Sequence, residues 1–433
     1  MSIYSEWGFN ENPFETKPLP PSEDGENLLV DRKLELRKII TRLSSTSNII
    51  TIEGSNGVGK TSLVNIAAFE MYRDYLIKHT GDFFIPCDQQ FQLTPEKSSI
   101  DFADEVLMTV AETLINRAKS FVDKGYDLKD NKYIAKWLNS PLVSSYNGNV
   151  GTSFFGIGFG KSTEANTSTG FQRMGFRTKI LDWLKEIFPF GTNGGVVCVI
   201  DNLELLQTSG NARKHMEELR DTLFSYTGLR WVLCGSLGIV NGVASSPRMK
   251  GRLLDPIEVL GIDSEFAAEI FDARAKALEL KTGKGYLPLS GEDFKLLYRI
   301  LNNNTRNALS HANDYCLWVA DEELCPNTKD EKSALFLNWL EMTSTRKVNS
   351  VRTQIKPRTF SVFKKSIKIG GAFSPSDFEI FGFNTLQAMR PHISLLEESR
   401  LVTSSIDESD KRRKTIQVTA EGWLFNYGLK SDK

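Results

Sequence analysis

Residues 54–61 read Gly-Ser-Asn-Gly-Val-Gly-Lys-Thr and match the phosphate-loop pattern G-x-x-x-x-G-K-[ST]. This pattern is meaningful only between a strand and a helix; here an apolar run precedes it and a helical pattern follows it. In such a loop, backbone N–H groups close around phosphates, the lysine reaches the β- and γ-phosphates, and the threonine hydroxyl ligates Mg²⁺. We therefore expect a nucleotide and Mg²⁺, held by Gly54, Ser55, Asn56, Gly57, Val58, Gly59, Lys60, Thr61 and Ser62.

A second apolar run, residues 196–200, ends at Asp201. Such a run is typical of a buried parallel strand, and a carboxylate at its end can hold the water shell of Mg²⁺. Any buried strand would have the same appearance, so the assignment depends on its pairing with Lys60 and Thr61. The next run, residues 230–235, ends at Ser236, which either lies beside the phosphates at the carboxyl end of the sheet or is a turn residue.

The length and the charge distribution of the chain limit how its domains can be organised. At 433 residues, two or three domains are expected. The net charge of −1 conceals an asymmetry, because residues 341–433 hold 16 Lys and Arg against 10 Asp and Glu, a balance of +6 that leaves −7 elsewhere. This separation suggests that the C-terminal part meets a polyanion; a solvated basic surface is the alternative.

The sequence also indicates where the protein works. Its apolar runs are shorter than the roughly 20 residues of a membrane span, and its first residues lack the pattern of a signal peptide. We expect a cytoplasmic protein with no membrane partner. The cysteines show no C-x-x-C spacing, which favours buried free thiols over disulfides or a metal site; they are Cys87, Cys198, Cys234, Cys316 and Cys325.

Apolar spacing predicts the remaining elements. Residues 1–27 cannot form a core of their own, but their aromatic side chains can dock on one. One helix, with Leu34 on its apolar face, is expected before the first strand, and another, with Ile100 on its apolar face, is expected after the second strand. We expect strands near 48–53, 82–88, 196–200, 230–235 and 256–260, and helices near 34–43, 60–77, 100–115, 173–188 and within 263–322. The resulting parts are an extension (1–27), an α/β core (28–262), a helical lid (263–332) and a C-terminal domain (333–433).

Residues 126–172 are rich in Gly, Ser, Asn and Thr and read as a polar insertion, either functional or disordered. Residues 150–159 and 167–171 are candidate arms of a hairpin. Within the insertion, residues 156–162 resemble a second phosphate loop. Phe155 stands where the pattern needs glycine, and neither a clear strand nor a helix flanks the stretch, so we do not expect a nucleotide there.

Four features in order resemble a known family. Residues 29–36, with Val30 and Arg32, are similar to an adenine-side motif; the loop and Asp201 supply the Walker motifs. Residues 245–253 look like an arginine-finger segment with Arg248 at the arginine position, and residues 303–309 resemble a sensor-2 motif with Arg306. The chain thus resembles the AAA+ ATPases, in their branch of origin-recognition and replication-initiator proteins. The resemblance implies a parallel sheet flanked by helices, a helical lid and the cofactors ATP and Mg²⁺.

The resemblance also implies roles in catalysis for Lys60, Asp201, Glu204, Ser236, Arg248 and Arg306. Arginine suits both of its positions because a planar guanidinium can stabilise the phosphoryl oxygens during cleavage; the alternative for each is an ordinary surface cation. A finger acts in trans, so Arg248 implies a homo-oligomer. Asn202 departs from the family, which has glutamate there. Either Glu204 substitutes for it, or hydrolysis is slow and the protein acts as a switch.

Residues 333–433 resemble a winged helix-turn-helix domain. Residues 374–378 open a short helix, residues 382–384 make a turn, and Leu386, Met389, Ile393 and Leu396 form an apolar core stripe. The opposite face offers Thr385, Gln387, Ala388 and Arg390, which suit base edges and phosphates in a major groove. Pro391 is expected to kink this helix or end its first part.

Residues 401–405 and 415–419 alternate as two strands of a hairpin that resembles the wing of MarR-type regulators. Near its tip lie four consecutive cations, Lys411, Arg412, Arg413 and Lys414. Contacts with DNA phosphates account for such a cluster better than folding does. Winged domains also serve as protein-contact modules, and that reading stays open.

Two functions therefore fit the sequence. The first is an initiator-like AAA+ ATPase that assembles on double-stranded DNA under the control of ATP, in replication, a plasmid, a transposon or a phage-defence system with an effector protein. The second is an ATP-switched signalling or scaffold ATPase whose winged domain and insertion bind a partner protein. The C-terminal charge favours the first function, and the aromatic, weakly charged residues 150–160 favour the second.

Overall fold

The computed structural model describes residues 2–94, 96–118, 132, 135, 173–189, 194–203, 209–236, 248–280, 285–407 and 413–431. The expected hairpin arms 150–159 and 167–171, the loop-like residues 156–162, and Glu204, Lys411 and Arg412 lie outside these ranges. Only the backbone of Arg413 and Lys414 is described. In the described part of the chain, no helix is both long and apolar enough to cross a membrane.

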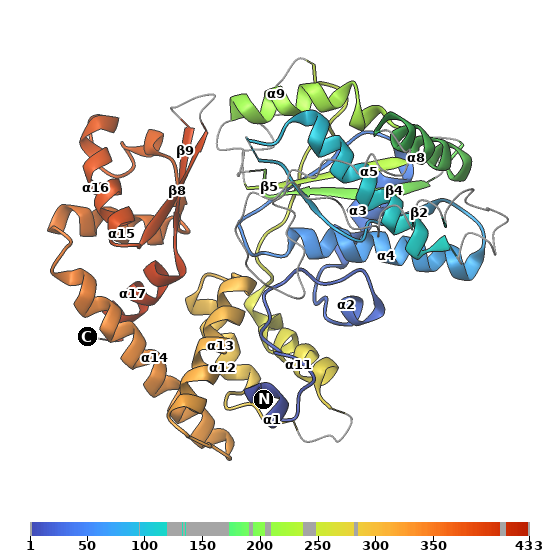
Figure 1. The fold of residues 1–433 in the computed structure, drawn as a ribbon. Helices are drawn as coiled ribbons and strands as arrows, with labels where there is room; N and C mark the ends of the chain where they lie inside the picture. The colour runs from blue at the N-terminus through green and yellow to red at the C-terminus, as the bar shows by residue number, and fades with distance from the viewer. Residues whose placement is uncertain are drawn as a thin grey trace, which may run out of the picture.

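A parallel β-sheet forms the centre of the larger domain (Figure 1). Its strand order is β2-β4-β5-β1-β6, with β3 beside β4. The strands are β1 Ile50–Glu53, β2 Phe83–Pro86, β3 Phe91–Gln92, β4 Gly194–Asp201, β5 Leu229–Gly235 and β6 Ile257–Glu258. The sequence predicted all of them except β3, which has only two residues. The strand expected to reach residue 260 is shorter, and Leu260 is exposed.

Helices cover both faces of this sheet. Alternate residues of a strand point to opposite sides, and in β4 the residues on both sides are apolar, so each face needs a covering layer. Val197 and Val199 of β4 pack in one cluster with α3 and α4, whereas Cys198 and Ile200 pack in another with α5, α8 and α9. The helices are α3 Lys33–Ser45, α4 Lys60–Lys78, α5 Ser99–Asn116, α8 Arg173–Ile187 and α9 Ser209–Arg220. The layered α/β fold is therefore confirmed.

Three residues that were expected to be buried, Leu34, Ile100 and Cys325, are exposed instead. Leu34 and Ile100 are 74% and 59% exposed, because each lies in the first turn of its helix and points to solvent instead of the sheet. All five cysteines are free thiols as predicted, and four are buried. Cys325 is exposed because it lies in the loop between two helices.

A helical lid follows the sheet, and the N-terminal extension packs on it. The lid comprises η4 Ser264–Phe266, α11 Ala267–Leu278, α12 Gly291–Ile300 and α13 Thr305–Asp321, and a capping box joins Ser290 and Asp293 at the start of α12. The extension contains α1 Ile3–Glu6 and α2 Glu23–Asn27. Its Tyr4, Phe9 and Phe14 are buried in the core of the lid, so the expected docking of the aromatic residues is confirmed.

One long helix, α14 Lys329–Arg352, connects the lid to the C-terminal domain (Figure 1). Near its start Phe336 and Trp339 belong to the core of the lid, and near its end Val348 and Val351 belong to the C-terminal core. The last helix, α17 Ala420–Ser431, packs along α14. The two domains thus share an element.

The C-terminal domain has the order of elements of a winged helix-turn-helix. These are α15 Pro357–Lys368, β7 Ala372–Phe373, η5 Pro375–Asp377, α16 Leu386–Glu398, β8 Val402–Asp407 and β9 Arg413–Val418, with an antiparallel sheet of order β7-β9-β8. Met389, Ile393 and Leu396 are buried, and Leu386, at the first position of the helix, is half-buried.

The expectation that Pro391 could end the first part of this helix is wrong, because α16 continues through it. A proline inside a helix removes a hydrogen bond to the carbonyl four residues earlier. Here that carbonyl belongs to Gln387, in the exposed first turn of the helix. Water can therefore satisfy the carbonyl, and the helix tolerates the proline.

Candidate nucleotide site

The ends of three adjacent parallel strands define the site. In the sheet, β5 lies between β1 and β4, and Glu53 pairs with Gly235 while Ile200 pairs with Leu233. The residues that follow these strands therefore meet at one edge. This edge carries Gly54 after β1, Ser236 after β5 and Asp201 at the end of β4, as predicted from the sequence.

The loop after β1 has the backbone that its glycines permit. Gly57 and Gly59 have φ angles of 85° and 96°, a left-handed region that glycine adopts without steric cost. Gly59 is the N-cap of α4, so the loop leads directly into the positive end of a helix. Lys60 is 7% exposed, and its Nζ donates to the carbonyls of Gly54 (2.9 Å) and Ser55 (3.2 Å). The amine thus lies within the loop.

Thr61 and Asp201 meet across the edge of the sheet. The Thr61 Oγ1 donates to Asp201 Oδ2 at 2.7 Å, and both side chains are buried. A hydroxyl and a carboxylate are hard oxygen ligands of the kind that Mg²⁺ prefers, directly or through its waters. This pair therefore fits a magnesium ion, with Thr61 and Asp201 as its protein contacts.

Asn202, at the position where the resembled family has glutamate, has a left-handed backbone with φ of 55°. Its N–H donates to Asp201 Oδ1 at 2.8 Å. Asparagine adopts this conformation more readily than most residues because its short side chain can bond locally. Asn202 therefore suits the turn that orients Asp201, and a glutamate there would be strained.

A pocket runs from the loop to the lid. It is lined by residues 56–62 of the loop, by Asp201 and by Arg306, and its apolar wall suits an adenine base; that wall comprises Leu19, Leu28, Leu29, Val30, Ile262, Ile270 and Leu309. Ser236 reaches the same loop, with its Oγ donating to Asn56 Oδ1 at 3.3 Å. The structure thus brings Val30, Arg32, Asp201, Ser236 and Arg306 together around Lys60, and it places Arg248 elsewhere.

Arg32 lines this pocket but its charged end is already engaged. It is buried, its Nη2 donates to the carbonyls of Val58 (2.9 Å) and Leu260 (2.7 Å), and its Nη1 pairs with Glu35 at 2.9 Å. Arg32 therefore clamps the phosphate loop to the chain that leaves the sheet. Its contribution to a nucleotide site is to hold the loop in place.

Sequence reasoning missed one wall of the pocket. Residues 16–19 of the extension cross from the lid to α4 and line the pocket. The N–H of Leu19 donates to Ser62 Oγ at 3.0 Å, and Asn65 Nδ2 donates to the Leu19 carbonyl at 2.8 Å. At the lid end, Arg274 Nη1 donates to the carbonyls of Pro13 (3.1 Å) and Glu15 (3.0 Å). We call residues 13–19 the strap.

Arg274 is the buried anchor of the strap. It is 9% exposed, and burial lowers the pKa of its guanidinium to about 10, so it is charged at neutral pH. Replacing Arg274 with Met removes two charge-assisted hydrogen bonds and leaves two carbonyls without their donor. We expect a loss of about 2–3 kcal/mol of stability, measured by chemical denaturation, and weaker binding of ATP. Lys276→Met, an exposed change on the same helix, is the control; equal effects of the two changes would contradict the anchor role.

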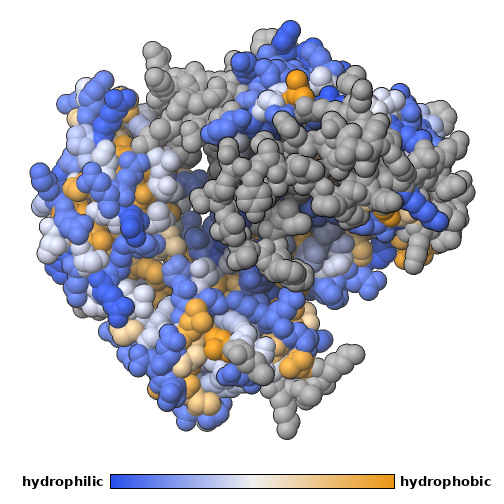
Figure 2. Space-filling view, in the orientation of Figure 1, coloured by the Kyte–Doolittle hydropathy of each residue, from blue (hydrophilic) through white to orange (hydrophobic). Residues whose placement is uncertain are grey.

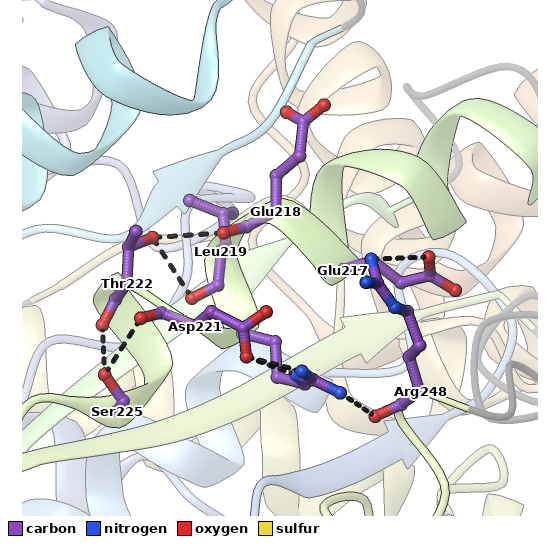
Figure 3. A network of polar contacts seen from close by, with 8 residues as sticks. Glu217, Glu218, Leu219, Asp221, Thr222, Ser225 and Arg248 are labelled. Carbon is purple, nitrogen blue, oxygen red and sulfur yellow. Dashed lines mark hydrogen bonds and ion pairs between the residues drawn. The ribbon is translucent and has the colours of Figure 1, made fainter.

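Arg248 lies elsewhere, beside the end of α9 (Figure 3). Its side chain is 64% exposed and is not among the described residues that line the pocket. Its Nη1 lies 3.9 Å from Glu217 Oε2, and Arg220 Nη1 donates to its backbone carbonyl at 2.9 Å. Arg248 therefore faces outward from a braced backbone, a geometry suited to a second subunit.

The predicted DNA-contacting face of α16 is open. Thr385 is the N-cap, with its Oγ1 accepting from the Ala388 N–H at 3.3 Å, and Thr385, Gln387, Ala388 and Arg390 are all exposed. Arg358 braces the turn before this helix by lying over the Phe383 ring, 4.4 Å from its centroid, and donating to the Gly382 carbonyl. Figure 2 shows that hydrophilic residues cover most of the C-terminal domain on this side.

No protein-family model and no curated protein matches the chain. Among solved structures it is similar to the ORC1 protein of Aeropyrum pernix in complex with DNA, at 14% identity and a TM-score of 0.46, covering 98% of this chain and 97% of that one. It is also similar to the ORC2 protein of the same organism in ADPNP and ADP complexes, at 10% identity and a TM-score of 0.45, covering 98% of this chain and 99% of that one. A third similar structure is CDC6p of Pyrobaculum aerophilum, at 12% identity and a TM-score of 0.39, with 98% of this chain and 99% of that one covered. Likenesses this distant assign no function.

Proposed function

We propose that this chain, which has the layered core, lid and winged domain implied by its resemblance to origin-recognition-type AAA+ ATPases, is an initiator-like ATPase that assembles on double-stranded DNA under the control of ATP. One observation carries the proposal: the phosphate loop, the Thr61–Asp201 pair and Arg306 of the lid line one pocket, and α14 joins that lid to the winged domain. ATP with Mg²⁺ is the ligand that this set of residues fits.

In this proposal each residue of the pocket has a separate role in binding or hydrolysing ATP. Lys60 and the loop N–H groups bind the phosphates, and Thr61 and Asp201 hold Mg²⁺, which when bound neutralises charge on the phosphates. Arg306 approaches the γ-phosphate from the lid, and Arg248 of one subunit completes the site of the next. With Asn202 beside Asp201, the described residues offer no carboxylate at the family's water-orienting position, which favours slow hydrolysis that resets the assembly.

A DNA titration tests the function as a whole. The ATPase rate is measured against increasing double-stranded DNA, and the size of the protein is measured with and without ATP. We expect DNA to raise the rate and ATP to raise the mass of the particle. If ATP changes the size but DNA changes neither quantity, the DNA role is wrong and the winged domain is a contact module for a partner protein.

The wing gives a sharper test of DNA binding. Reversing the charges of Lys411, Arg412, Arg413 and Lys414 to Glu should weaken DNA binding at least tenfold, because interactions with phosphates dominate affinity. The slope of log K against log salt should fall by up to about 4, at roughly 0.9 for each phosphate that the wing no longer neutralises.

The control for the wing variant reverses three exposed cations of α3: Lys33, Arg37 and Lys38. These lie on the ATPase core, and we expect both the affinity for DNA and its salt slope to stay as in the unchanged protein. An unchanged salt slope in the wing variant, or an equal loss in the α3 variant, would show that the wing does not contact phosphates.

A further inference from the structure

The first turn of α13 rests directly on the phosphate loop. Asn304 Nδ2 donates to the Asn56 carbonyl at 2.6 Å, and the N–H of Arg306 donates to the Gly57 carbonyl at 3.2 Å. A Cβ on Gly57 would lie 2.7 Å from both Arg306 Cβ and Asn304 Oδ1, closer than side-chain carbons come to other atoms. The lid and the loop are therefore in contact with no space between them.

Asn304 uses both ends of its amide. Its Oδ1 accepts from the N–H of Asn307 at 3.0 Å and so caps α13, while its Nδ2 faces the loop. Serine, threonine or aspartate would serve as well as a cap, but aspartate has no donor, and the single hydroxyl of serine or threonine lies one bond closer to the backbone than an amide N–H. Asparagine is thus the capping residue that can also bind the carbonyl of Asn56.

Asn56 extends the contact to the sheet. Its side-chain Oδ1 accepts from Ser236 Oγ at 3.3 Å, while its backbone carbonyl accepts from Asn304. Hydrogen bonds thus run from the end of β5, through the phosphate loop, to the first turn of α13. Three segments that are distant in the sequence meet at this single loop residue.

The contacts of the lid also fix the orientation of two backbone N–H donors in the phosphate loop. A trans peptide group is planar and points its N–H opposite to its C=O. The two carbonyls held by the lid belong to the peptide groups that carry the N–H of Gly57 and of Val58. Binding the carbonyls therefore fixes the direction of two N–H groups in the phosphate-binding loop.

We propose that Asn56 and Asn304 form a latch that positions Arg306 over the phosphate loop and couples the docking of the lid to the binding of ATP, a step that rests on the ATPase function proposed above. Asn304 is a positioning residue: it lies two residues before Arg306 and holds the turn on which Arg306 sits. Because coupling between two events is reciprocal, ATP that orders the loop strengthens the docking of the lid, and a docked lid strengthens the binding of ATP.

Asn304→Ser tests the latch, because serine keeps the cap but loses the amide N–H that reaches the Asn56 carbonyl; its hydroxyl lies one bond closer to the backbone and is engaged by the cap. We expect ATP affinity, measured by calorimetric titration, to fall about fivefold, the effect of one net hydrogen bond. The melting temperature should stay close to that of the unchanged protein. Hydrogen exchange in residues 303–309, which include the Arg306 N–H bound to Gly57, should be slowed by ATP in the unchanged protein and not in the variant.

Ser290→Ala is the matched control, since it removes the cap of α12 in the same lid without touching the loop. It should lower the melting temperature and leave ATP affinity and the exchange of residues 303–309 unchanged. If Asn304→Ser keeps full affinity and full ATP-dependent protection, or if Ser290→Ala weakens ATP binding equally, there is no latch. Failure of the unchanged protein to bind ATP would instead overturn the proposed function itself.

Discussion

Lys60→Ala is expected to weaken ATP binding about 100-fold and to abolish turnover. The amine is buried in the loop and has only two backbone carbonyls within hydrogen-bond distance among the described residues, so phosphate oxygens would be its strongest partners. Hydrogen bonds to charged groups each contribute about 1.5–3 kcal/mol, and each 1.4 kcal/mol is about tenfold in affinity. The binding of a fluorescent ATP analogue and the release of phosphate measure the two effects.

Lys78→Ala is the control for this change. Lys78 is the last residue of the helix that Lys60 begins, and it pairs with Asp74 in solvent, where such pairs contribute little. We expect the control to bind and hydrolyse ATP normally. If Lys60→Ala retained normal affinity, the loop would not be the nucleotide site, and every role assigned around it would fall.

Arg248→Ala is expected to lower turnover at least 100-fold while leaving the affinity for ATP unchanged. An arginine that stabilises the transition state in trans accelerates phosphoryl transfer by about 10³–10⁵ in well-measured enzymes. The side chain here is exposed and lies outside its own pocket, so its removal should not disturb ATP binding by the same subunit. Steady-state turnover and equilibrium binding separate the two quantities.

A mixing experiment decides whether Arg248 acts between subunits. Equal amounts of Arg248→Ala and Lys60→Ala protein should recover part of the turnover, because a hybrid interface combines an intact pocket with an intact arginine. Lys250→Ala, an exposed change two residues away, should keep full activity. No recovery on mixing, together with normal assembly, would mean that Arg248 is an ordinary surface cation.

Local sequence patterns predicted those parts of the site that depend on residues close together in the chain. The strand, loop and helix around residues 54–61 follow from a motif, and Asp201 and Ser236 follow because parallel strands end at one edge. For these features the sequence was sufficient, since each depends on spacing within one element or on the geometry of a parallel sheet.

Contacts between distant segments were beyond such reasoning. Arg274 holds residues more than 250 positions earlier in the chain, and no pattern near it marks it as an anchor. Asn304 was recognised only as a neighbour of Arg306; its bond to Asn56 depends on how the lid packs. The errors at Leu34, Ile100 and Pro391 have a related cause, because periodicity does not tell which end of a helix leaves the core or which carbonyl faces water.

The continuity of α14 has a mechanical consequence. A helix of 24 residues is about 36 Å long at 1.5 Å per residue, and it has hydrophobic contacts in the lid at one end and in the winged domain at the other. It is therefore one continuous connection between the two hydrophobic cores. In the proposed function, a rotation of the lid by about 10° would displace the end of α14, about 20 Å beyond Trp339 at 1.5 Å per residue, by roughly 3 Å, and α16 would move with it relative to the bound DNA.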